Sequence, residues 1–375
     1  MSSTKQTKSP DRPKEMRASK RPGVEKSPDK PKGLNVVSGA SGFLGSHLLH
    51  ALLSEGRPVR ALKRSSADLT GVKQVFDYYG DSALFEQIEW RDCNLLDPFD
   101  LREALAGGKR AFHCAGMVSF ERAQRKPMLH FNLNSTINML DAAFNNGFEH
   151  FLHVSSSSAI GSSPDDIPAN ESMIWSREKD SSAYGHSKFM SEMEVWRAIE
   201  EGLPAAIVNP TVILGPGFWT KGGSSSIFHR VAGGLRYATP GTTGFVGVKD
   251  VVSAMIWLSA QGLTGERFIV NAANASYKEV FEQIASALGM DRPFRSVSAR
   301  QLSILAGLDA FLSLFGLPRH ITREQARSAF TTSRFSGEKL SKALGRPLQD
   351  LESVIRETAL YYRKDYPLKE KAPLP

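Results

Sequence analysis

Residues 34–64 constrain this chain more than any other part of its sequence. The run 34–38 is apolar and suited to a strand that is buried on both faces, and it leads directly into three glycines at three-residue spacing, Gly39, Gly42 and Gly45. Leucines at helical spacing follow the glycines, and a second apolar run follows the leucines. The pattern predicts a strand, a tight turn, a helix and a second strand in immediate succession.

Each glycine of this turn has a different physical use. Gly39 permits the tight turn, Gly42 lets the backbone approach a pyrophosphate, and Gly45 lets the helix lie close to the sheet. The free N–H groups at the start of the helix then face the phosphates. A turn of this kind can be purely structural, but its place between a buried strand and an amphipathic helix favours a dinucleotide site.

The end of the second strand indicates which dinucleotide binds. An acidic residue there usually holds a free adenosine ribose, whereas arginine holds a 2′-phosphate. The chain has Lys63 and Arg64, then Ser65 and Ser66, and no carboxylate before Asp68. We therefore expect NADP, with NAD as the alternative. Two solvated cations at a strand end are the plainer interpretation of the same residues.

Charge is unevenly distributed along the 375 residues, whose formal net charge is +8. Residues 1–33 hold ten basic and four acidic residues, five prolines, no aromatic residue and an imperfect repeat of residues 8–14 at 26–32. Such a segment cannot bury enough apolar area to fold, so we expect a disordered basic tail that binds nucleic acid weakly at most. The rest of the chain has 37 basic and 35 acidic residues, which gives no reason to expect a nucleic-acid-binding core.

Strand-like and helix-like segments alternate over residues 34–210. This alternation predicts an α/β fold with a doubly wound parallel sheet, a Rossmann domain. A smaller substrate-binding lobe is expected at 211–375, from which residues 248–271 return to the first domain. Strands are expected at 34–38, 58–63, 87–93, 111–115, 150–155, 205–209 and 267–271, helices at 97–106, 131–145, 183–201, 248–259 and 277–288, and a polar loop at 65–86. The apolar run 302–317 suits a core or lid helix, an oligomer surface or a membrane-facing patch.

Cysteine usage and hydropathy bear on the compartment. Only Cys93 and Cys114 are present, both in apparent strand regions, so we expect no disulfide framework. No apolar run reaches 18 residues, and the basic tail lacks the apolar core of a signal peptide. We expect a cytoplasmic protein with no membrane span and no bound metal.

Hydroxyl and basic groups gather at the ends of two later segments. A serine run, Ser155 to Ser158, follows the strand expected at 150–155, and an expected helix carries Tyr184 and Lys188 one turn apart. An ammonium beside a phenol lowers the pKa of the phenol and suits it to general acid–base catalysis. A tyrosine and a lysine at this spacing are common on helices. Behind a glycine turn and a serine run, however, they favour a catalytic site.

These motifs together resemble the short-chain dehydrogenase/reductase superfamily in its extended form, the NAD-dependent epimerase/dehydratase family. The resemblance covers about residues 34–365. It rests on the motifs at residues 39–45, 113–116, 132–143, 155–156, 184–188, 209–216 and 248–251.

The resemblance implies a role for each matching residue. Tyr184 is the implied catalytic acid/base, Lys188 tunes it and holds the nicotinamide ribose, Ser156 orients the substrate oxygen, and Asn132 is the helix asparagine associated with the active site. Asn94 replaces the usual adenine-contacting Asp, which leaves open whether Asn94 or Asp92 reaches the adenine. The implied cofactor-binding residues are Gly39, Ser41, Gly42, Phe43, Leu44, Gly45, Lys63, Arg64, Asn94, Leu95, Ala115, Gly116, Tyr184, Lys188 and Pro210.

The expected sixth strand separates subgroups of the family. Residues 209–212, Asn-Pro-Thr-Val, look like the dihydroflavonol-reductase and 3-beta-hydroxysteroid-dehydrogenase branch, whereas nucleotide-sugar epimerases and dehydratases usually have an arginine there. Together with Arg64, this favours an NADP-dependent oxidoreductase of a small-molecule carbonyl or alcohol. The alternatives are a nucleotide-sugar epimerase or dehydratase with retained NAD and a non-catalytic dinucleotide-binding protein. The resemblance also implies a homodimer through helices 131–145 and 183–201.

Overall fold

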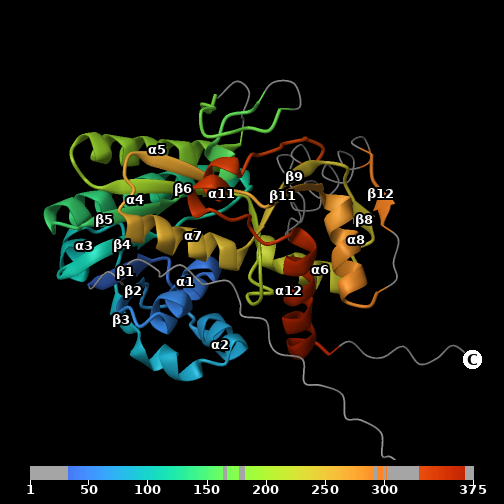
Figure 1. Ribbon diagram of the computed structural model, residues 1–375, viewed down its shortest axis with the longest axis horizontal. Helices are drawn as coiled ribbons and strands as arrows, with labels where there is room; N and C mark the ends of the chain where they lie inside the picture. Colours follow the sequence, from blue (N-terminus) through green and yellow to red (C-terminus); the bar gives the residue numbers. More distant parts are fainter. Residues whose placement is uncertain are drawn as a thin grey trace, which may run out of the picture. The chain divides into compact units, whose positions relative to one another are not determined.

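A computed structural model describes residues 33–163, 167–176, 182–290, 294–298, 301 and 329–367. Within these residues the main element is a parallel sheet of seven strands in the order β10-β6-β5-β4-β1-β2-β3 (Figure 1). The predicted α/β class and doubly wound parallel sheet are confirmed. The strands are β1 (Leu34–Ser38), β2 (Val59–Lys63), β3 (Glu89–Asp92), β4 (Gly108–His113), β5 (His150–Val154), β6 (Ala205–Pro210) and β10 (Glu266–Val270).

The strand order places a crevice at one edge of this sheet. β1 pairs with β2 on one side and with β4 on the other, so the chain reverses its direction of winding between β1 and β4. In an open parallel sheet, ligands bind beyond the carboxyl ends of the strands at such a reversal. The glycines that follow Ser38 and the residues that follow His113 therefore meet at the same edge.

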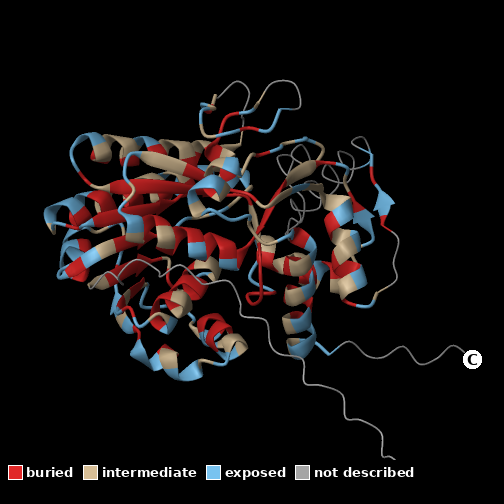
Figure 2. Cartoon of the chain, viewed as in Figure 1, coloured by how far each residue is buried: buried red, intermediate tan, exposed pale blue. Residues whose placement is uncertain are grey.

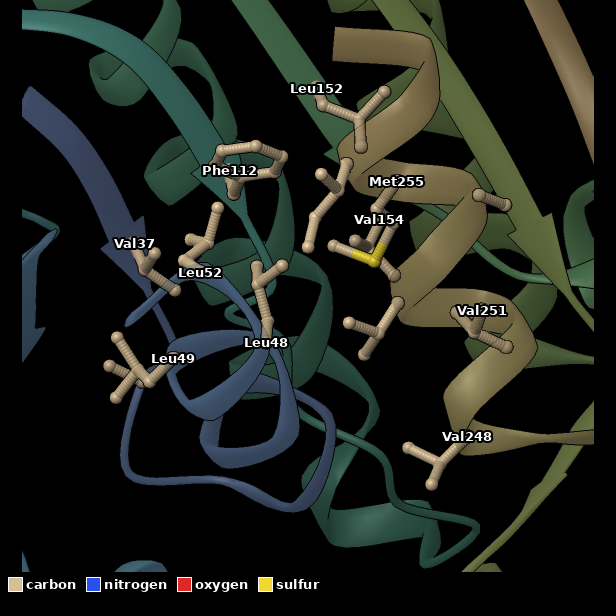
Figure 3. Packing of buried hydrophobic residues seen from close by; sticks show 14 of the residues in the cluster. Val37, Leu48, Leu49, Leu52, Phe112, Leu152, Val154, Val248, Val251 and Met255 are labelled. Carbon is tan, nitrogen blue, oxygen red and sulfur yellow. The ribbon is translucent and has the colours of Figure 1, made fainter. Parts of the chain in front are cut away.

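Both faces of the sheet are buried beneath helices (Figure 2). Successive strand residues enter opposite cores, as Val36 and Val37 do in β1. The core that contains Val37 also contains Leu48 of α1, Phe112 of β4 and Met255 of α7 (Figure 3). The helices of this core are α1 (Phe43–Ser54), α2 (Thr70–Tyr79) and α7 (Val248–Gln261), and those of the opposite core are α3 (Pro98–Ala104), α4 (Arg125–Asn145) and α5 (Ala183–Glu200).

A third core joins smaller elements from the later part of the chain. Phe228, Phe245, Ile284, Ile355 and Tyr362 are buried together in it. Its strands and helices are β7 (Val212–Leu214), β8 (Tyr237–Ala238), β9 (Thr242–Gly247), β11 (Ala273–Ser276), α6 (Ile227–Ala232), α8 (Tyr277–Ala287) and α12 (Leu351–Asp365). Two short elements, β12 (Arg295–Ser296) and α11 (Glu338–Leu344), lie beside β8 and β10 respectively. The domain boundaries at residues 33 and 210, and the substrate-binding role of the later part, stay predictions.

One predicted segment is wrong. Residues 65–86, expected as a polar loop, contain α2 and the short 3-10 helix η1 (Ser82–Gln87). The reason is that Val72, Val75 and Phe76 recur at helical spacing and are fully buried, although polar residues stand between Val72 and Val75 and after Phe76. The helix expected at 131–145 begins six residues earlier, at Arg125, and the apolar run 302–317 lies outside the described residues.

Candidate active site

Two glycines of the turn after β1 cannot carry a side chain because of the fold itself. Gly39 has a φ of +68°, and a Cβ on it would lie 2.6 Å from the backbone nitrogen of Ala115, beyond the end of β4. A Cβ on Gly45 would lie 2.3 Å from the carbonyl oxygen of Gly39. The turn, the start of α1 and the end of β4 are therefore packed backbone against backbone.

Gly42 differs from these two glycines because the fold leaves room beside it. It is exposed, its φ is −94°, and a built Cβ would meet only the carbonyl oxygen of Gly39, at 3.2 Å. It precedes α1 without a side-chain cap, so the first N–H groups of the helix are available to an anion. This open cradle fits the pyrophosphate of a dinucleotide.

The other residues assigned to the cofactor surround this turn. Ser41 and Leu44 lie within it, and the ring of Phe43 meets the ring of Phe218 edge to face with centroids 6.1 Å apart. Pro210 is buried at the end of β6. Their contacts with a cofactor stay predictions.

Lys63 and Arg64, the two cations at the end of β2, differ in their surroundings. Lys63 forms an ion pair with Asp92, its partner in the register between β2 and β3. Arg64 is exposed and has no ion-pair partner among the residues that the structure describes. Arg64 is thus the cation that remains available for a 2′-phosphate, while the charge of Lys63 is already balanced.

The turn after β3 carries Asn94 and Leu95, the residues predicted to contact the adenine. The side-chain oxygen of Asn94 accepts a hydrogen bond from the backbone nitrogen of Leu96 at 3.1 Å, and the carbonyl of Leu95 accepts one from Asn138 at 3.1 Å. These contacts keep the turn against α4. Asp92 is paired with Lys63, and the side-chain oxygen of Asn94 is engaged by Leu96, so which of the two reaches an adenine stays a prediction.

Lys188 is buried at the carboxyl end of β5. Its side chain is 4% exposed, and its ammonium donates a hydrogen bond to the carbonyl oxygen of Val154 at 2.7 Å. Burial lowers the pKa of Lys188 to about 8, while the charge of Glu192 and the thiol of Cys114 oppose this shift. The position of Lys188 is therefore set by a strand end 34 residues earlier in the chain.

Tyr184 lies one helical turn before Lys188 and is half-buried. Burial raises the pKa of its phenol, and interaction with the Ser156 hydroxyl opposes the rise. The expected lowering of this pKa by Lys188 is therefore wrong for the folded chain. The reason is that the ammonium of Lys188 is held by the carbonyl of Val154, while desolvation of the phenol dominates.

Ser156 and Asn132 are the other two residues predicted to be catalytic. The Ser156 hydroxyl accepts a hydrogen bond from the backbone nitrogen of Ser158 at 3.1 Å, which shapes the turn after β5. The buried amide of Asn132 accepts from the nitrogen of Met117 at 2.7 Å and donates to the Ser187 hydroxyl at 2.9 Å. Asn132 thus fastens the loop after β4 to the helix of Tyr184.

Gly116 leaves the space between these groups open. A Cβ there would lie 3.7 Å from the ammonium nitrogen of Lys188 and 3.7 Å from the side-chain oxygen of Asn132. The structure therefore brings Gly116, Asn132 and Lys188 together, as the sequence predicted. Their contacts with substrate or cofactor stay predictions.

The sequence reasoning missed a buried polar group beside Lys188. Glu192, on the next turn of α5, is fully buried, and Arg267 of β10 and Asn209 of β6 donate hydrogen bonds to its carboxylate. A signal was present, because Glu192 lies four residues after Lys188 on the helix face that packs on the sheet. An acidic residue on that face indicates a buried partner.

Two kinds of feature are absent from the described part of the chain. No cluster of three or more His, Cys, Asp or Glu side chains there could hold a metal ion. None of the helices in the same ranges combines the length and the apolar character that crossing a membrane requires.

Comparison with known proteins finds one matching family and several similar proteins. A sequence model of the NAD dependent epimerase/dehydratase family matches residues 35–273. The chain is similar to sterol demethylase protein B of Methylococcus capsulatus, at 29% identity over 291 residues, 77% of this chain and 84% of that protein. It is 26% identical to dihydroflavonol 4-reductase of Hordeum vulgare over 259 residues, 65% of this chain and 72% of that one. The crystal structure of gox2253 superposes with a TM-score of 0.75 at 27% identity, covering 90% of this chain and 100% of that chain.

Proposed function

This chain belongs to the NAD dependent epimerase/dehydratase family, and we propose that it is an NADP-dependent reductase of carbonyl groups that also oxidises the corresponding secondary alcohols. The observation that carries the proposal is the meeting of Ser156, Tyr184 and Lys188 at the sheet edge that holds the glycine turn. A hydroxyl, a phenol and an ammonium at the mouth of a dinucleotide crevice are the groups that reversible carbonyl reduction needs.

The chain's own residues handle the proton and the orientation of the substrate. The nicotinamide, when bound, donates hydride to the carbonyl carbon or accepts it from the alcohol. The Ser156 hydroxyl holds the substrate oxygen, and the Tyr184 phenol donates a proton to that oxygen in reduction and removes it in oxidation. The ammonium of Lys188 would hold the ribose of the nicotinamide and so keep the cofactor beside the phenol.

The preference for NADP rests on Arg64. Its guanidinium is exposed and unbalanced by any described carboxylate, so a 2′-phosphate at the end of β2 would form a charge-assisted pair worth about 1.5 to 3 kcal/mol. Lys63 contributes less, because it is already paired with Asp92.

The test is cofactor choice in the wild type and in Arg64→Asp. The substitution removes the phosphate contact and offers a carboxylate to the hydroxyls of a free ribose. The ratio of kcat/KM with NADPH to that with NADH should therefore fall roughly tenfold to a hundredfold, since each 1.4 kcal/mol is about a factor of ten. Arg356→Asp, at an exposed position on α12, is the matched control and should leave the ratio unchanged.

Two results would contradict this proposal. A wild type that prefers NADH, or a ratio that Arg64→Asp does not move, would remove the NADP assignment. Purified protein that carries NAD it does not exchange would favour a nucleotide-sugar epimerase or dehydratase.

The same proposal includes a homodimer in which α4 and α5 pack against their symmetry mates. Phe144 of α4 is 51% exposed and Met193 of α5 is 38% exposed, which leaves apolar surface on this side of the molecule. Light scattering at micromolar concentration tests it, and a monomer there would disprove it. Both cysteines are free thiols, which supports a reducing, cytoplasmic compartment.

A further inference from the structure

Glu192 connects α5 to β6 and β10 and, through Asn209, to the residues that follow β5. One carboxylate oxygen accepts a hydrogen bond from the Asn209 amide, and the other accepts one from the Arg267 guanidinium at 3.1 Å. The same amide nitrogen of Asn209 donates to the carbonyl oxygen of Ser156 at 3.0 Å. Glu192 therefore reaches the backbone of Ser156 through one side chain.

Burial raises the pKa of the Glu192 carboxyl above its usual value, although Ser155, Arg267 and Asn209 limit the rise. The ion pair with Arg267 favours the ionised form. Its two oxygens accept hydrogen bonds from the Asn209 amide and from the guanidinium of Arg267, which carries a permanent charge. A buried carboxylate that is paired and hydrogen-bonded on both oxygens is the form in which such a charge is tolerated.

Glu192 also lies one helical turn from Lys188, on the same buried face of α5. The other titratable groups around this ammonium are Tyr184, Cys114 after β4, His113 of β4 and His153 of β5. Burial holds these histidines neutral and the Cys114 thiol protonated, because it lowers the pKa of both imidazoles and raises that of the thiol. Glu192 is therefore the carboxylate that acts on the charge of Lys188.

We propose that Glu192 is a positioning residue of the active site, which keeps the ammonium of Lys188 charged and holds in place the strand end that carries Ser156. The inference rests on the proposed function, because Lys188 matters only where a dinucleotide and a phenol use its charge. Arg267 balances part of the charge of Glu192 and ties it to β10. Asn209 carries the positional effect to Ser156.

The consequence is a specific pH dependence of dinucleotide binding. If the charged ammonium holds the nicotinamide ribose, affinity falls as the pH rises through the pKa of Lys188, which is about 8. Removal of the charge of Glu192 lowers that pKa, so the loss of affinity begins at lower pH. The 2′-phosphate titrates equally in the wild type and in the variants, and it cancels in their ratio.

The experiment compares wild type, Glu192→Gln and Glu194→Gln. Dissociation constants for NADPH and NADH are measured by fluorescence from pH 6.5 to 8.5. Relative to wild type, Glu192→Gln should bind with less than about a twofold change at pH 6.5 and about five- to tenfold more weakly at pH 8.5, as a one-unit fall in the pKa of Lys188 requires. Glu194 is on the same helix and also pairs with an arginine, Arg197 at 2.8 Å, so it controls for the substitution itself. Its variant should follow the wild-type curve.

The alternatives give different curves. A Glu192→Gln protein that binds more weakly by the same factor at every pH, or that follows the wild-type curve, would overturn the inference and leave the proposed function intact. If Glu192→Gln does not fold by circular dichroism, Glu192→Asp keeps the charge but withdraws it, and it should show a smaller shift in the same direction. An unshifted Glu192→Asp curve would also overturn the inference. A wild type that binds neither dinucleotide would overturn the proposed function and this inference together.

Discussion

The glycine turn and the catalytic corner meet at one sheet edge but are built in opposite ways. The turn, residues 39–45, is shaped by backbone contacts, such as that between Gly39 and Ala115. The catalytic corner is the group of Ser156, Tyr184, Lys188, Glu192 and the buried polar side chains beside them. Its properties come from side chains on different strands and helices. The shape of the turn depends on the absence of side chains, whereas the charges and hydrogen bonds of the corner depend on how deeply its side chains are buried.

The largest effect should come from the corner. Tyr184→Phe keeps the ring but removes the proton donor, so turnover should fall by about two to four orders of magnitude. Dinucleotide affinity should stay within a few-fold of wild type, because the crevice is unchanged. The measurement is single-turnover reduction of any carbonyl compound that the wild type accepts, with affinity determined separately. Tyr237→Phe, at an exposed position on β8, is the control. Near wild-type turnover in Tyr184→Phe would exclude the phenol as the acid/base.

The turn should separate folding from binding. Gly45→Ala places a Cβ against the carbonyl of Gly39, so it should lower the free energy of unfolding by roughly 1 to 3 kcal/mol. In Gly42→Ala the Cβ would meet only the carbonyl oxygen of Gly39, at 3.2 Å, so the free energy of unfolding should fall by less than in Gly45→Ala. Its affinity for NADPH should fall about tenfold or more as the methyl group meets the pyrophosphate.

Urea unfolding and dinucleotide titration on both variants test this pair. If Gly42→Ala binds as wild type does, the phosphates do not approach the turn at that residue. Equal destabilisation of both variants would mean that the fold, and not a ligand, requires Gly42.

Acid should lower the stability of the fold through two buried histidines of β4 and β5. His113 and His153 lie between the sheet and α4, with ring centroids 5.4 Å apart, and burial lowers the pKa of His113 to about 3 and that of His153 well below 6.5. An imidazole whose pKa is lower in the folded than in the unfolded chain contributes stability that is complete above pH 6.5. That contribution is lost as the pH falls from 6.5 toward the folded value. Each such histidine should remove about 2 kcal/mol of stability between pH 7 and pH 5.

The variant His153→Leu removes one of these two histidines and so isolates its contribution to the loss of stability in acid. Its loss of unfolding free energy from pH 7 to pH 5 should be smaller than that of wild type by about 2 kcal/mol, whatever its stability at pH 7. His130→Leu, at an exposed position on α4, should lose as much as wild type does. Identical losses in wild type and His153→Leu would show that His153 is not held neutral in the folded chain.

Sequence patterns predicted the turn and most strands because their signals are local. The glycine spacing and the apolar run before it lie within twelve residues. The helix α2 was missed, since its three buried apolar residues, Val72, Val75 and Phe76, stand among polar ones. The pairing of Lys63 with Asp92 was also missed, because it depends on the register of β2 against β3.

The sequence by itself determined the parallel α/β architecture and the glycine turn, and it singled out Tyr184 and Lys188 as the pair to test. Each of these follows from residue types at short spacing, which the backbone converts directly into a strand, a turn or one helix face. Only the tertiary structure decided how burial shifts the pKa values in the catalytic corner. The pKa of Lys188 and that of Tyr184 depend on how far water is excluded from their side chains. Glu192 and Arg267 are 75 residues apart along the chain and meet only because α5 packs on the sheet.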